Sequence, residues 1–134
     1  MNSQQSGSIS IGYQAGLYEQ GSGAISIGLQ AGYFTQGLQS IAIGFGAGAD
    51  KQGNYCVGIG TDAQYLRAGL QSVGIGLNAG SNTQGVFSVA VGGYSGRESQ
   101  GTGSVAIGYE AASLTQGAYA VSVGYQAGRN SQQS

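Results

Sequence analysis

Two β-branched positions, separated by one small residue, recur with a constant 16-residue period along the whole chain. When the repeat is numbered from residue 5, the first unit is 5–20, the eighth is 117–132, and repeat positions 5 and 7 are always Ile or Val. Position 6 is always Ser, Ala or Gly. Residues two apart lie on the same face of a strand, and β-branched side chains favour strands. The pattern predicts one short strand per unit, and no apolar period of a helix is present.

Glycine marks the same period twice. One series runs from Gly12 to Gly124, once in each of the eight repeats, and a second runs from Gly21 to Gly117, once in each repeat after the first. A fixed short period is typical of repeat architectures, and this one is too short for a pair of helices. We expect a second strand at positions 9–11, as in 13–15 and 125–127, and a ladder of Gln at position 16. The chain is predicted to be all-β: one parallel β-solenoid domain of eight coils over 5–132, with partial coils at 1–4 and 133–134.

The alternation gives each predicted strand two different faces. We expect the β-branched face to form the solenoid core, because Ile and Val are among the residues most often buried. The predicted core residues are Ile9, Ile11, Ile25, Ile27, Ile41, Ile43, Val57, Ile59, Val73, Ile75, Val89, Val91, Val105, Ile107, Val121 and Val123. We expect the face of small residues to pack closely against another chain. Its residues are Ser8, Ser10, Ala24, Ser26, Ser40, Ala42, Cys56, Gly58, Ser72, Gly74, Ser88, Ala90, Ser104, Ala106, Ala120 and Ser122.

Charged residues occupy only one part of the repeat. They make up 7% of the chain, against about 25% in typical domains, and all lie at positions 10–15. This charged arc is predicted to face water, because unpaired charges are rarely buried. The uncharged remainder supports contact with another chain. Clustered apolar residues on a wet surface tend to mark interaction sites, and the candidate partner contacts on the charged arc are Leu17, Tyr18, Tyr33, Phe34, Tyr65, Leu66 and Leu114.

Several functional classes lack the residues that they need. The chain has no His, which excludes Ser-His-Asp and Cys-His catalysis, and we expect no enzyme activity, metal or cofactor. Its single cysteine, Cys56, is interpreted as a small packed residue. A net charge of −1 predicts no nucleic-acid binding. No apolar run approaches about 20 residues, so we expect neither a transmembrane segment nor membrane insertion. Residues 1–6 do not resemble a signal peptide.

The strand segments resemble a known family of surface repeats. Ser8–Gly12, Ser40–Gly44 and Ser104–Gly108 are similar to the S-V-A-I-G repeats of YadA-like heads in trimeric autotransporter adhesins. Segments such as Ile11–Gly16 and Val123–Gly128 also resemble repeats of phage and large-virus fibre proteins. The resemblance covers all eight coils. It implies a left-handed β-roll, a side-by-side homotrimer in which the small-residue face is the candidate trimer face, and a role in adhesion at a surface.

These observations favour a non-catalytic fibre or adhesin-head module on a virion or on an extracellular cell surface. Its rigid trimeric rod would present multivalent contacts to a host receptor or glycan. The alternative is a virion component that bridges or cements other capsid or fibre subunits without binding a receptor. A remote third reading is an ice-binding solenoid. Expected partners are further copies of the chain, side by side or stacked end to end, and another surface or virion protein.

Overall fold

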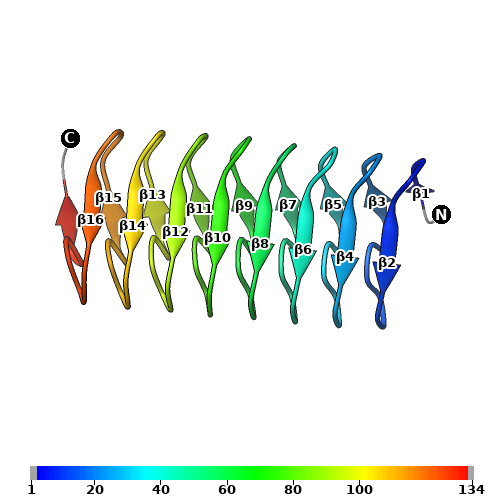
Figure 1. Ribbon diagram of the computed structural model, residues 1–134, viewed down its shortest axis with the longest axis horizontal. Coiled ribbons are helices and arrows are strands. Elements are labelled where there is room, and N and C mark those ends of the chain that lie inside the picture. The colour runs from blue at the N-terminus through cyan, green and yellow to red at the C-terminus, as the bar shows by residue number, and fades with distance from the viewer. Residues whose placement is uncertain (1–2, 133–134) are drawn as a thin grey trace.

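The computed structural model describes residues 3–132 as a straight stack of coils (Figure 1). Each coil contributes one three-residue strand and one two-residue strand, and the described residues contain no helix. The three-residue strands are β2 (Ile9–Ile11), β4 (Ile25–Ile27), β6 (Ile41–Ile43), β8 (Val57–Ile59), β10 (Val73–Ile75), β12 (Val89–Val91), β14 (Val105–Ile107) and β16 (Val121–Val123). The two-residue strands are β1 (Ser3–Gln4), β3 (Glu19–Gln20), β5 (Thr35–Gln36), β7 (Lys51–Gln52), β9 (Arg67–Ala68), β11 (Thr83–Gln84), β13 (Ser99–Gln100), β15 (Thr115–Gln116) and β17 (Ser131–Gln132).

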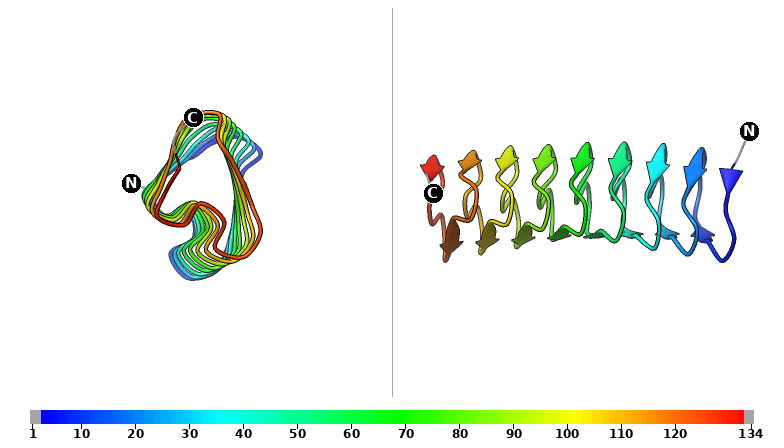
Figure 2. Two further views of the ribbon diagram at one scale, coloured as in Figure 1. Left: turned by 90° about the vertical axis from the view of Figure 1, so that its left-hand side faces the viewer. Right: turned by 90° about the horizontal axis from the view of Figure 1, so that it is seen from above.

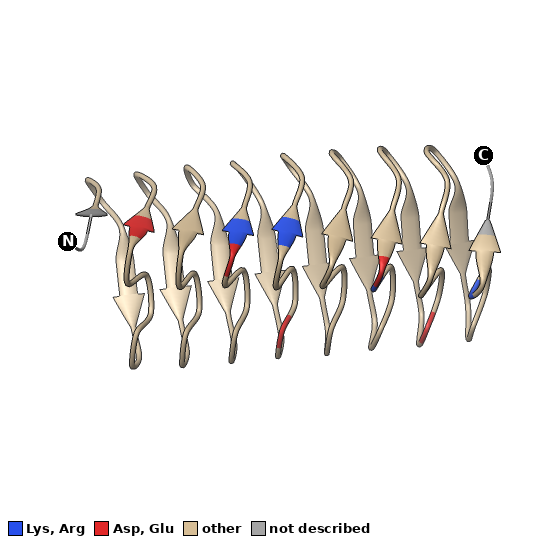
Figure 3. Cartoon of the chain, turned by 180° about the vertical axis from the view of Figure 1, so that it is seen from behind, with Lys and Arg blue, Asp and Glu red and all other residues tan. Residues whose placement is uncertain are grey.

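The strands form two parallel sheets, one of eight strands and one of nine. Every strand pairs with its equivalent in the next coil, one full repeat further along the chain, as Ile41 pairs with Val57. The arrows in Figures 1 and 3 show the chain winding as a left-handed coil. In the end-on view of Figure 2 the coils follow one nearly constant outline. The predicted parallel β-solenoid is therefore confirmed.

The predicted second strand was wrong in its position. Residues 13–15 and 125–127 lie in turns, and the second strand of each coil occupies repeat positions 15 and 16 instead. The predicted partial coil at 1–4 contributes β1 (Ser3–Gln4). Residues 1–2 and 133–134 of the two partial coils lie outside the described residues.

The first glycine series is required by backbone geometry. Gly60 has a φ of +126°, and a Cβ atom added there would lie 2.6 Å from the carbonyl oxygen of Gly76 in the next coil. The second series is required by space alone. At Gly37 an added Cβ would lie 2.5 Å from the carbonyl carbon of Gly53, although φ is not positive there. Both series thus set the distance of closest approach between neighbouring coils.

Small residues and glutamine fill the space inside the coils. The two apolar clusters of the interior consist entirely of alanine: Ala31, Ala42 and Ala47 in one, and Ala106, Ala111 and Ala112 in the other. Gln20 and Gln36 are among the largest fully buried side chains. The interior is therefore too narrow for a layer of Ile or Val side chains.

The predicted core and the predicted interchain face are consequently reversed. The β-branched residues lie on the outer face, where all are half-buried or exposed: Ile9, Ile11, Ile25, Ile27, Ile41, Ile43, Val57, Ile59, Val73, Ile75, Val89, Val91, Val105, Ile107, Val121 and Val123. The small residues line the interior, and all are buried except Ser8 and Ser10 of the first coil: Ser8, Ser10, Ala24, Ser26, Ser40, Ala42, Cys56, Gly58, Ser72, Gly74, Ser88, Ala90, Ser104, Ala106, Ala120 and Ser122. The physical reason is size, because the inner face admits no side chain larger than Cys at these positions.

Candidate functional site

A row of glutamine amides runs through the interior of the solenoid. Gln36 Nε2 donates a hydrogen bond to the carbonyl oxygen of Ile25 in its own coil at 2.7 Å, and Gln100 donates in the same way to Val89. Some neighbouring amides are also linked, as Gln20 Nε2 donates to Gln36 Oε1 at 3.2 Å, whereas Gln52 Oε1 and Gln100 Oε1 have no hydrogen-bond partner among the described residues. Buried polar groups are costly unless they are hydrogen-bonded. The predicted Gln ladder is thus present, but inside the coil.

In the fourth coil, a glutamine at a different repeat position supplies the interior amide. Ala68 replaces Gln at position 16, and Gln64 stands at position 12, where six of the coils have Gly. Gln52 Nε2 donates to Gln64 Oε1 at 2.9 Å, and Gln64 Nε2 donates to Gln84 Oε1 at 2.7 Å. A Cβ added to Gly74 would lie 2.7 Å from Gln64 Cγ, which explains the glycine at that inner position. The Gln64 amide, which comes from position 12, therefore takes the place in the row that the glutamine at position 16 fills in the neighbouring coils.

The outer face of the eight-stranded sheet is a broad apolar surface without charge. Its two columns of Ile and Val run the length of the stack, with Val123 exposed by 63% and Ile75 by 36%. Large apolar side chains just before the strand border this surface, namely Leu38, Tyr55, Leu70, Phe87 and Tyr119. The turn after the strand adds Tyr13, Leu29, Phe45, Leu77, Tyr109 and Tyr125. Exposed apolar patches of this extent mark interaction surfaces.

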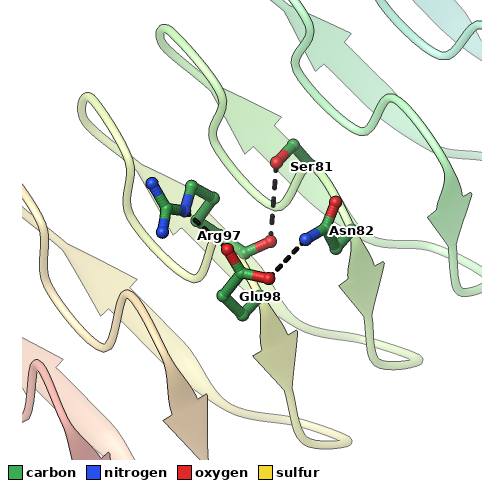
Figure 4. A network of polar contacts seen from close by, with 4 residues as sticks. All are labelled: Ser81, Asn82, Arg97 and Glu98. Carbon is green, nitrogen blue, oxygen red and sulfur yellow. Dashed lines mark hydrogen bonds and ion pairs between the residues drawn. The ribbon is translucent and has the colours of Figure 1, made fainter.

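The charged side chains lie off the three-residue strands, and Asp62 and Glu110 stand in the turn that follows these strands. Figure 3 shows them on the two-residue strands and adjoining turns, and none on the three-residue strands. Arg97 pairs with Glu98 at 2.9 Å, and Asn82 of the preceding coil donates a hydrogen bond to the same carboxylate (Figure 4). Arg129 pairs with Glu110 at 3.2 Å. The charged side chains are therefore not buried, but the predicted wet arc of repeat positions 10–15 was wrong in part, because positions 11 and 12 face the interior, as buried Ala31 and Gln64 show.

The candidate partner contacts lie on the surface of this arc, as expected. Tyr18, Phe34, Tyr65, Leu66 and Leu114 are exposed, and Leu17 and Tyr33 are half-buried. They do not form one patch, because Leu114 lies three coils beyond Leu66.

Three of the aromatic residues form a compact cluster. Tyr33 meets Phe34 edge to face at 4.6 Å, and Tyr18 stacks on Phe34 at 5.4 Å between ring centroids. A hydrogen bond with Tyr18 is the main cause that raises the pKa of Tyr33 above its usual value. Ring pairs of this geometry stabilise one another beyond simple burial. The cluster is therefore a rigid apolar feature of the first two coils.

Coil 3 leaves a depression beside this cluster, which sequence reasoning missed. Gly46 and Ala49 stand where coil 4 carries Asp62 and Tyr65. The resulting cavity of 220 Å³ is lined by Gln30, Tyr33, Phe34, Ala49, Asp50, Tyr65 and Leu66. A second cavity of 360 Å³ adjoins it and is lined by Gln30, Phe45, Asp62, Tyr65, Asn78, Ser81 and Asn82. The sequence does contain a sign of this depression. When the coils are aligned by repeat position, Ala49 of coil 3 occupies the position that holds Tyr33 in coil 2 and Tyr65 in coil 4.

Within residues 3–132, no group of three or more Cys, Asp or Glu side chains is placed to hold a metal ion. Cys56 is buried, and its Sγ lies 2.8 Å from the carbonyl oxygen of Gly69, within a packed row of small residues. No helix in the described part of the chain is long and apolar enough to span a bilayer. Comparisons of the chain with protein-family models, curated proteins and solved structures find no match.

Proposed function

We propose that this chain is a non-catalytic, rigid rod module of a fibre or adhesin head, and that it works as a side-by-side homotrimer. The observation that carries the proposal is the uncharged outer face of the eight-stranded sheet, with two columns of Ile and Val. A soluble monomer rarely exposes so continuous an apolar surface. The proposed trimer contact is the β-branched face, in place of the small-residue face expected from the sequence, because the small residues line the interior.

Two further features support association. The interior contains mainly Ala, Ser, Gly and Gln, so the described coils bury little apolar side-chain area of their own. Burial of apolar area is the dominant favourable term in folding and association. Contact between Ile and Val faces of several copies supplies the missing burial. The resemblance of the strand segments to trimeric YadA-like heads favours three copies.

In this arrangement the charged arcs face outward on all three sides of the rod. Weak contacts made by one copy are repeated three times, which raises the overall affinity for a surface that carries many receptors. The exposed aromatic residues of this arc favour a second candidate function, a component that cements other subunits of a virion or fibre. In that case Tyr18, Phe34 and Tyr65 are buried against a non-identical partner.

Native mass spectrometry of the purified chain tests the trimer. We expect a trimer for the native sequence and a monomer for Ile59→Lys, which places a charge in the middle of the apolar face. The matched control is Thr83→Lys, because Thr83 is exposed on the nine-stranded sheet. It should remain trimeric. Circular dichroism establishes that both variants keep their β structure. A monomeric native chain, or a folded Ile59→Lys trimer, would refute the proposal.

A further inference from the structure

The depression at coil 3 combines aromatic walls with negative charge. Tyr33 and Phe34 border it on one side and Tyr65 on the other, and Asp50 lines the cavity between them. The backbone continues through coil 3 without a gap, since Phe34 N donates to Ala49 O and Asp50 N to Tyr65 O, both at 2.8 Å. The depression is therefore a consequence of side-chain size in coil 3 and not of a break in the stack.

The charges of the depression are not neutralised by ion pairs. The ion pairs within residues 3–132 are Arg97–Glu98 and Arg129–Glu110, so neither Asp50 nor Asp62 belongs to one. Lys51 directly follows Asp50 and Arg67 directly follows Leu66, but neither cation lines a cavity. Asp50 and Asp62 are thus the charged groups among the residues that line the two cavities. A carboxylate beside aromatic ring faces attracts cations.

We propose that this depression, defined by Tyr33, Phe34, Asp50, Asp62 and Tyr65, binds a quaternary ammonium group such as the trimethylammonium group of choline. Aromatic side chains grouped around a carboxylate recognise such cations through cation–π attraction and charge. Tyr33, Phe34 and Tyr65 supply aromatic rings at the smaller cavity, and Asp50 supplies the negative charge. A methylated cation relies on ring faces and charge and needs no hydrogen-bond acceptors.

The same arc already contains a cation held by an aromatic ring. The guanidinium carbon of Arg97 lies 5.8 Å from the centroid of the Tyr94 ring. Contacts within about 6 Å are in the range of cation–π attraction. In coils 2 to 4 the rings and carboxylates lack a comparable cation among the residues that line the cavities. The proposal does not depend on the trimer, because none of the residues of the apolar surface line the smaller cavity.

Titration of the isotopically labelled native protein with choline, followed by NMR, tests the site directly. We expect saturable shifts at coil 3 and its neighbours, with half-saturation in the millimolar range. The neutral isostere, in which a tert-butyl group replaces the trimethylammonium group, should bind at least about tenfold more weakly. Absence of saturable choline binding over the millimolar range, or equal binding of the isostere, would overturn the proposal.

Two variants and one control locate the interaction. Asp50→Asn and Tyr65→Leu should each weaken choline binding about three- to tenfold. Glu98→Gln removes a carboxylate at the same repeat position three coils away, about 14 Å along the rod, and should leave binding unchanged. Native affinity in both folded site variants would contradict the assignment. Co-sedimentation with phosphatidylcholine vesicles distinguishes the source: sedimentation indicates a lipid headgroup, and choline binding without sedimentation indicates a soluble cation.

Discussion

Exchanging the interior glutamine of coil 4 between its two possible positions is the sharpest test of how the solenoid is packed. Gln64→Gly removes the amide that links Gln52 to Gln84. Gln84 Oε1 then loses its donor, and a buried unsatisfied acceptor costs about 1–3 kcal/mol. The void left by a buried side chain adds about 2 kcal/mol, the low end of the range for apolar cores, because water can solvate this polar slot.

One effect acts in the opposite direction. Gln64 has a φ of +51°, and a left-handed conformation costs a residue with a Cβ atom about 1 kcal/mol. Glycine relieves this strain. We therefore expect Gln64→Gly to lower the free energy of unfolding by about 2–4 kcal/mol.

The second single substitution should also destabilise the fold. Ala68→Gln places a second amide in a slot that Gln64 already fills, and overpacking of an interior costs about 1–3 kcal/mol. The double variant Gln64→Gly/Ala68→Gln restores the arrangement of the neighbouring coils, with Gly at position 12 and Gln at position 16. Its free energy of unfolding should lie within about 1 kcal/mol of that of the native protein.

Urea unfolding followed by far-UV circular dichroism measures all four proteins. The two destabilising effects should cancel in the double variant, which corresponds to a coupling free energy of at least about 2 kcal/mol. If instead the double variant is as unstable as the two single effects added together, the two residues do not share one slot. The account of the interior would then be wrong.

Four further substitutions, one of them a control, test other parts of the structure by the same unfolding measurement. Gly60→Ala should destabilise the protein by more than about 3 kcal/mol, because the added Cβ atom would meet the backbone of the next coil. Gly93→Ala is the control and should change stability by less than about 1 kcal/mol, because its Cβ atom would lie 3.4 Å from the flexible side chain of Tyr109. Ala90→Ser should stabilise by about 1 kcal/mol, because it offers a hydroxyl to Gln100 Oε1, a buried acceptor without a partner among the described residues; no gain would contradict this. Burial raises the pKa of Asp62 above its unfolded value of about 3.8, so the folded state holds the proton more tightly and stability falls as the pH rises through the raised pKa. Asp62→Asn should therefore be more stable than the native protein at neutral pH and equally stable below about pH 3, and a pH-independent difference would contradict this cause.

The repeat determined the fold class because it fixes the register. A constant repeat length without insertions sets equivalent residues of successive coils side by side, as the pairing of Ile41 with Val57 shows. The direction of the faces could not be inferred in the same way. Alternation in a strand distinguishes two faces, but it does not say which of them is inside. Burial of hydrophobic residues was the wrong criterion here, because it assumes an interior wide enough to hold them.

A better criterion was present in the sequence. The residue at position 6 is never larger than Ser in any coil. Its two glycines, Gly58 and Gly74, belong to the coil that carries Gln64 and to the coil that follows it. A limit on size indicates limited space, and the smallest residues stand beside the bulkiest interior side chain. The depression at coil 3 was missed for a related reason. It arises from side chains that are absent at Gly46 and Ala49, whereas a search for functional residues looks for side chains that are present.

The reversed faces change what stabilises this protein. Inside the coil, hydrogen-bonded Gln, Ser and backbone groups define the geometry, and the net stabilisation from each such bond is modest. The side chains with the largest potential gain from burial, the Ile and Val residues of the eight-stranded sheet, point away from the coil. Their contribution depends on a second surface that covers them. The repeat therefore encodes two structures at once: a narrow polar scaffold within the chain, and an apolar face whose burial links the stability of the rod to its assembly.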